Sequence, residues 1–239
     1  MRTKISVKIL KPTSVINNDL VAVFGDPCIL TLDGRGSFHI CVNPYSGQYS
    51  KSIRIDKFVF EKIDSKLLCD SAKRSLHVDN AGGKSAISEA FSIYYFEWIR
   101  KASNFVFETE VDYWVDYKMV DFICSIDDKR VGVSVTRAMG FPSPDCFTYE
   151  DALKLLRKKL YGLIVARNCV SKKHSFFRSV LHIWCQSETI ASHLRNAYAS
   201  FDQEDFGLDV AGNVLLLLTV CDEKILYFET KSALHLLRS

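Results

Sequence analysis

The segment MVDFICSIDDKRVGVSVTRA, residues 119–138, narrows the fold more than any other, because it has the pattern of two strands joined by a short charged turn. A two-residue turn at Asp127 and Asp128 pairs Asp121 with Ser134, whereas a four-residue turn pairs Asp121 with Thr136. Both registers place the three polar side chains on one face. The opposite face is then wholly apolar and is expected to pack into a core: Val120, Phe122, Cys124, Ile126, Val131, Val133 and Val135.

Helical and strand patterns alternate around this hairpin. From residue 85 onward the expected order is α-β-β-β-α-β-α-β-β, with helices at 85–102, 149–167 and 189–201 and strands at 105–115, 119–126, 130–136, 180–186, 214–220 and 225–229. This order predicts a mixed α/β sheet with helices on its faces.

The first part of the chain has a different pattern. Residues 1–64 contain short β segments broken by Gly, Pro and Asn, and the polar stretch 70–84 ends in NAGGK. The sequence therefore predicts a small β-rich unit at 1–80 and an α/β domain at 85–239 that includes a C-terminal helix and strands.

Composition indicates a globular protein, since 48% of the 239 residues are hydrophobic. The longest apolar run, VLLLL at 214–218, is far shorter than the roughly 20 residues that a membrane span needs, so no membrane segment is expected. The eight cysteines contain no C-x-x-C pair. They favour buried free thiols and hence an intracellular location, cytoplasmic or nuclear rather than organellar.

The charge distribution points to a polyanionic partner. The net charge is only +3, but residues 152–187 contain no Asp or Glu, and their eight cations are Lys154, Arg157, Lys158, Lys159, Arg167, Lys172, Lys173 and Arg178. Such a segment can attract nucleic acid, DNA or RNA. A solvated helix face with a basic loop is the alternative.

The polar residues of the hairpin, together with an acid on the preceding helix, form a pattern that resembles the PD-(D/E)XK nuclease superfamily over about residues 85–187. The resemblance implies a restriction-endonuclease-like α-β-β-β-α-β core. It also implies that Glu89 and Asp121 bind Mg²⁺ or Mn²⁺, and that Ser134 and Thr136 occupy the positions of the acid-x-lysine pair. The alternative for each acid is an ordinary structural position.

The acid-x-lysine positions depart from the superfamily's pattern. Two hydroxyl side chains supply neither the negative charge that holds a divalent metal nor the cation that stabilises a developing phosphorane. Arg137, or Lys159 on the following helix, could restore the cation. Glu110 and Asp112, which alternate along the strand expected at 105–115, could restore the carboxylate, although an exposed strand face is expected for both.

Two functions follow from this pattern. The first is a nucleic-acid-processing protein, a metal-dependent phosphodiester hydrolase with an altered site, whose basic residues Arg137, Lys158, Lys172, Lys173 and Arg178 bind the nucleic acid. The second is a catalytically inactive scaffold that keeps the fold and binds a protein partner.

Two weaker signals remain. The segment GGKSA at 82–86 resembles part of a phosphate-binding loop, but Val78 stands where the first glycine belongs, so a Gly-Gly linker is preferred. Phe176, Phe177 and Trp184 lie near the basic loop and could stack on bases, although core packing is the favoured interpretation.

Overall fold

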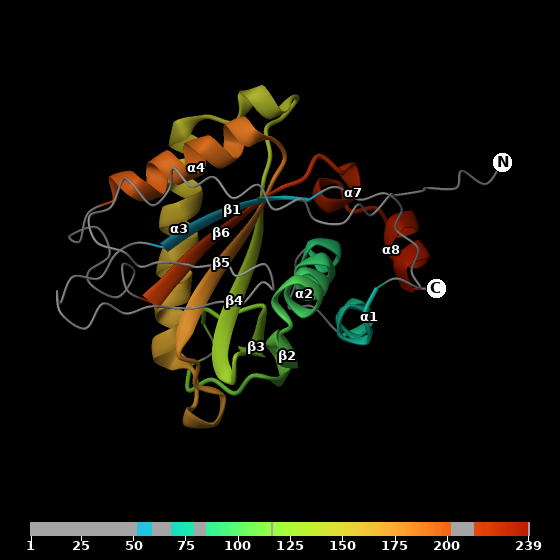
Figure 1. Cartoon of the computed structure of the whole chain (residues 1–239), viewed down its shortest axis with the longest axis vertical. Coiled ribbons are helices and arrows are strands. Elements are labelled where there is room, and N and C mark those ends of the chain that lie inside the picture. The colour runs from blue at the N-terminus through green and yellow to red at the C-terminus, as the bar shows by residue number, and fades with distance from the viewer. Residues whose placement is uncertain (1–51, 59–67, 79–84, 116, 202–212, 239) are drawn as a thin grey trace.

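The computed structural model describes residues 52–58, 68–78, 85–115, 117–201 and 213–238 (Figure 1). Within these residues one mixed sheet has the strand order β1-β6-β5-β4-β3-β2. Its strands are β1 Ser52–Lys57, β2 Ser103–Phe107, β3 Phe122–Ile126, β4 Lys129–Ala138, β5 Arg178–Cys185 and β6 Val214–Val220. Strands β1, β6, β5 and β4 are parallel, and β3 and β2 extend the sheet with antiparallel pairings. The expectation of a mixed α/β sheet is confirmed.

Helices cover both faces of the sheet (Figure 1). The described helices are α1 Asp70–His77, α2 Ala86–Arg100, α3 Tyr149–Cys169, α4 Glu188–Ser200, α7 Lys224–Tyr227 and α8 Lys231–Arg238. Helices α3 and α4 pack on one face, where the side chains of Leu156, Leu160 and Leu194 are fully buried. Helices α1, α2, α7 and α8 cover the other face. The parallel strands are thus buried on both sides, which explains why β6 is a continuous apolar run.

The β3–β4 hairpin has the two-residue turn, because Ile126 pairs with Lys129. The turn residues Asp127 and Asp128 have φ angles of 47° and 61°, the left-handed values that match a tight hairpin to the twist of its strands. The register of β3 ends at Phe122, which lies opposite Val133, and the N–H of the preceding Asp121 donates to the Val133 carbonyl at 2.9 Å.

One face of the hairpin is apolar as expected, except that Val120 packs in the core beneath α3 rather than in the core beneath α2. The polar face is also covered, since only 7% of Ser134 is exposed.

Helix α3 shows how local sequence sets an element's start. Thr148 and Asp151 form a reciprocal capping box, in which the Thr148 hydroxyl accepts a hydrogen bond from the Asp151 N–H, and the Asp151 carboxylate accepts one from the Thr148 N–H at 3.0 Å. The buried side chains that follow are spaced for one helical face: Ala152, Leu156, Leu160, Leu163 and Ala166.

Some expected elements differ in the structure. The strand expected at 105–115 ends at Phe107 and is followed by a 3₁₀ turn, Glu108–Glu110. Where a strand was expected at 225–229, the structure has helix α7, Lys224–Tyr227. Two further helices were not expected: α1, which lies within the polar stretch 70–84, and α8.

The described part of the N-terminal region joins the main sheet. Strand β1 pairs with β6 in parallel, and α1 contributes Ala72 and Leu76 to the same core as α2. A boundary near residue 80 therefore does not separate these two elements from the α/β body. The expected β segments at 1–51 and the GGKSA glycines lie outside the described residues.

Among the described residues, no helix is long and apolar enough to cross a membrane. The cysteines of this part of the chain are free thiols: Cys124, Cys185 and Cys221 are buried, Cys69 and Cys169 are half-buried, and Cys146 is exposed.

A buried polar cluster joins the sheet to α2. His182 on β5 is fully buried, and its Nε2 lies 2.9 Å from the Thr219 hydroxyl of β6. The rings of Tyr95 and Trp184 have centroids 5.3 and 4.8 Å from the imidazole. Burial lowers the pKa of His182 to about 3, and of the nearby charges Asp56 raises this pKa while Arg100 lowers it further. The imidazole is therefore neutral in the folded protein at physiological pH.

We expect His182 to make the protein less stable in acid. Between pH 6.5 and about 3 the unfolded chain binds a proton at this residue and the folded chain does not, so the free energy of unfolding falls with pH by up to about 1.4 kcal/mol per unit. His182→Gln should flatten this acid limb in urea unfolding measured between pH 7 and 4. The exposed His235→Gln is the matched control. An unchanged slope in His182→Gln would show that the buried imidazole is protonated normally.

Candidate functional site

The candidate site lies where β4 extends beyond the end of β3. The pairing of β3 with β4 ends at Phe122 and Val133, so the backbone of Val135 has no β3 residue opposite it. Side chains satisfy both of its polar groups. The Asp121 carboxylate accepts a hydrogen bond from the Val135 N–H at 2.6 Å, and the Lys159 ammonium donates one to the Val135 carbonyl at 3.3 Å. This arrangement brings an acid from the start of β3 and a lysine from α3 to the same residue.

The electrostatics of Asp121 reflect two opposing effects. Burial raises the pKa of its carboxyl, while the positive charge of Lys159 and hydrogen bonds from the Val135 N–H and the Ser134 side chain lower it. Burial is the largest of these effects, so the net direction is upward. A cation placed beside this carboxylate would therefore offset a real desolvation cost.

Glu89 and Asp121 line one small cavity. Glu89 is in the first turn of α2, where its carboxylate accepts a hydrogen bond from the Ser85 hydroxyl at 2.5 Å. The cavity is small: a volume of about 20 Å³ is accessible to water, which is room for about one water molecule. Its walls come from α1, α2, the end of β2 and the start of β3: Ser75, Val78, Glu89, Ile93, Phe107, Glu108, Thr109 and Asp121.

Glu108 is a carboxylate that the sequence analysis missed. It begins the 3₁₀ turn after β2, and its N–H donates to the Asp121 carbonyl at 3.0 Å, which places it at the cavity wall. The strand expected at 105–115 drew attention to Glu110 and Asp112 instead. A signal was present, because Glu108 is the first polar residue after the apolar run FVF.

The other residues expected to supply the missing carboxylate or cation lie elsewhere. Glu110 forms an ion pair with Arg74, and Asp112 forms one with Lys173 at 3.0 Å. Arg137 points to the α7 side of the sheet, where its guanidinium donates to the Leu226 carbonyl at 3.2 Å. These contacts are structural, and they leave Lys159 as the cation that lies near Asp121.

The arrangement has oxygen ligands of the kind that Mg²⁺ and Mn²⁺ prefer, but few of them. Among the described residues, no three Asp, Glu, His or Cys side chains are grouped closely enough to hold a metal ion. Ser134 is buried beside Asp121, whereas Thr136, two residues further along β4, is half-buried. A metal at Glu89 and Asp121 would therefore need water or substrate oxygens to complete its coordination.

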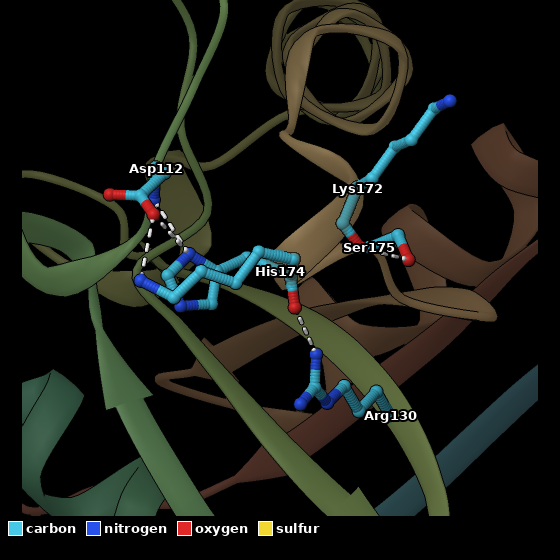
Figure 2. Close-up of polar contacts among 6 residues, drawn as sticks. Asp112, Arg130, Lys172, His174 and Ser175 are labelled. Carbon is cyan, nitrogen blue, oxygen red and sulfur yellow. Dashed lines mark hydrogen bonds and ion pairs between the residues drawn. The ribbon is translucent and has the colours of Figure 1, made fainter.

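The basic loop, which connects α3 to β5 and contains Lys172 and Lys173, lies at the turn end of the hairpin, beside Arg130 (Figure 2). Figure 2 shows the Lys172 side chain pointing away from Asp112, whereas Asp112 is paired with the Lys173 ammonium and lies 3.5 Å from the His174 ring. Arg130 donates to the Lys173 carbonyl at 2.5 Å, which ties the loop to β4. The exposed cation of this loop with no ion pair among the described contacts is thus Lys172.

The remaining basic and aromatic candidates divide by burial. Lys158 on α3 is exposed, and Arg178 is half-buried with its guanidinium 5.4 Å from the Phe177 ring centroid. Phe176 and Trp184 are buried, so the core interpretation holds for both. Phe177 is half exposed beside Lys129 and Arg178.

Comparison with known proteins gives one informative match. The chain is 33% identical over 138 residues to a protein described as "AAC-rich mRNA clone AAC4 protein" from Dictyostelium discoideum. The match covers 55% of this chain, and the chain spans about a fifth of the length of that relative (20%). No family model and no solved structure matches the chain.

We expect the effect of Asp121→Asn on the stability of the fold, relative to wild type, to be more favourable at neutral pH than in acid. The variant keeps an oxygen that can accept from the Val135 N–H, and it removes a carboxyl whose pKa is raised by burial. Because ionising this carboxyl costs the folded state, wild type loses stability as pH rises above about 3.8, and the variant does not. The difference in unfolding free energy, variant minus wild type, should thus increase from pH 3 to 7 in urea titrations. Asp145→Asn, at an exposed carboxyl, is the control.

Proposed function

We propose that this protein is a nucleic-acid-processing protein of the PD-(D/E)XK type, with a restriction-endonuclease-like core and a site formed by Glu89, Asp121 and Lys159. The observation that carries the proposal is the meeting of Asp121 and Lys159 at Val135, at the wall of a cavity that Glu89 also lines. The helix acid and the strand acid are parts of the pattern that the sequence resembles, and Lys159 would replace the lysine that the pattern places on β4.

The order of elements also supports the proposal. Helix α2 is followed by the antiparallel strands β2, β3 and β4, then by α3 and by β5, which lies parallel to β4. This is the α-β-β-β-α-β order that the resemblance implies. It places α2 and α3 on opposite faces of the sheet, with the proposed site at the end of β3 between them.

Each residue has a proposed role in phosphodiester hydrolysis. Glu89 and Asp121 would hold Mg²⁺ or Mn²⁺, which supplies charge stabilisation for the attacked phosphate. Lys159 would stabilise the negative charge that develops on the phosphoryl oxygens. Ser134 would hold the Asp121 carboxylate through its hydrogen bond, in place of a second acidic ligand.

One observation favours the second function, a nuclease-like scaffold without catalysis. Asp121 and Lys159 both satisfy the backbone of Val135, so each has a structural task in the absence of any metal. In that case the cavity would bind no divalent ion, and the functional feature of the fold would be its surface.

Calorimetry with Mn²⁺ and Mg²⁺ separates the two functions. We expect wild type to bind Mn²⁺ with a measurable heat, and we expect Asp121→Asn to lose most of it, because an amide carries no charge to balance the cation. Asp145→Asn should bind as wild type does. If wild type shows no heat when metal is added, and circular dichroism verifies that it is folded, the scaffold is favoured.

Salt-dependent binding to nucleic acid tests the basic loop. Lys172→Ala should lower the slope of log affinity against log salt concentration by about 0.7 to 0.9, the change expected for one lost phosphate contact. Lys173→Ala should change the slope less, because its ammonium is already paired with Asp112. The measurement is fluorescence anisotropy of a labelled oligonucleotide from 20 to 200 mM salt. Lys224→Ala on α7, an exposed lysine on the other face of the sheet, is the control.

A further inference from the structure

Large aromatic side chains are exposed along the outer side of α3. Trp114 is 71% exposed, Tyr117 58% and Tyr161 52%. Basic side chains lie among them, and together they form what we call the aromatic-basic strip: Trp114, Tyr117, Lys118, Arg157, Lys158 and Tyr161. Aromatic groups are normally buried, so several exposed on one surface indicate an interaction site.

Contacts place the two segments of the strip side by side. The Trp114 N–H donates to the Cys169 carbonyl at 2.8 Å, and Tyr113 forms an antiparallel bridge with Val170, so residues 113–114 lie at the C-terminal end of α3. Further along the helix, the Lys118 side chain passes 4.0 Å from the position that a Cβ would take on Gly162. Tyr161 adjoins Gly162 in the sequence.

The basic members continue the strip toward the middle of α3. Arg157 and Lys158 precede Tyr161 by four and three residues, so they share its face of the helix. From Arg157 to the Trp114 contact at Cys169 the helix rises by roughly 18 Å, at 1.5 Å per residue. The strip is therefore long enough to contact several consecutive groups of an extended ligand.

Charge identifies the kind of ligand. Residues 152–187 contain no acid, and the nearby Asp112 is already paired with Lys173 and lies beside His174. Asp116 lies outside the described residues. Cations beside exposed aromatic rings match a polyanion that also offers flat apolar faces. Single-stranded nucleic acid has both features, because its phosphates are charged and its bases are free to stack, whereas the bases of a duplex are already stacked on one another.

We propose that the aromatic-basic strip binds single-stranded nucleic acid, with bases stacked on Trp114, Tyr117 and Tyr161 and phosphates on Lys118 and Lys158. This inference rests on the proposed function and adds the strand state of its ligand. Because Lys158 neighbours Lys159 in the sequence, the strip would lead a single strand toward the end of β3.

The test compares single-stranded and double-stranded probes. Labelled oligo(dT) and oligo(U) of 12 nucleotides, and a DNA duplex of 12 base pairs, are titrated with the full chain and followed by fluorescence anisotropy. Trp114→Ala and Tyr161→Ala should each weaken binding of the single strands about fivefold or more, and binding of the duplex much less. Trp114→Phe, which keeps an aromatic face, should bind nearly as wild type does. The two single-stranded probes distinguish DNA from RNA.

Phe228→Ala is the matched control, since Phe228 is an exposed aromatic residue directly after α7. It should bind all probes as wild type does. If wild type binds single strands and both alanine variants bind equally well, the strip is not the binding surface, while the proposed function stands. If wild type binds neither single strands nor duplex at low salt, both proposals fail. If Trp114→Ala instead converts a dimer to a monomer in size-exclusion chromatography, a second copy of this chain covers the strip.

Discussion

The unequal lengths of β3 and β4 are the constraint on which the candidate site depends. Strand β4 continues past the end of β3, so the amide and the carbonyl of Val135 would be buried without a strand partner. An unsatisfied buried backbone group costs about 1 to 3 kcal/mol. The Asp121 carboxylate and the Lys159 ammonium prevent this cost, one at each group. The same two contacts place an acid and a lysine side by side between two layers of helices.

The proposed site has a serine where the superfamily's pattern places a second strand acid. Ser134 lies beside Asp121 and favours its ionised carboxylate without adding a second negative charge. Glu89 and Glu108 reach the cavity from α2 and from the turn after β2. The charges of the proposed site thus come from four separate elements, which only the packed sheet brings together.

The two faces of the sheet serve different purposes in the proposed function. The α2 side contains the buried cluster around His182 and Arg100, where Arg100 pairs with Asp56 at 3.0 Å with little exposure to solvent. The α3 side combines an apolar core with an outer surface of cations and exposed aromatic rings. Binding of a polyanion would therefore take place on α3, over the same helix that supplies Lys159.

The sequence by itself determined the hairpin, the mixed α/β class and the helix at 149–167, because side-chain alternation and helical spacing are local signals. It left the hairpin register open between a two-residue and a four-residue turn, and the structure decided for the two-residue turn. The sequence also singled out Asp121, Glu89 and Lys159 as candidates. Only the tertiary structure decided that Lys159 rather than Arg137 lies near Asp121, that residues 224–227 form a helix, and that Glu108 lines the cavity. The physical reason is that these outcomes depend on which strand edges are already paired and on which face of the sheet a side chain points, and contacts between distant segments settle both.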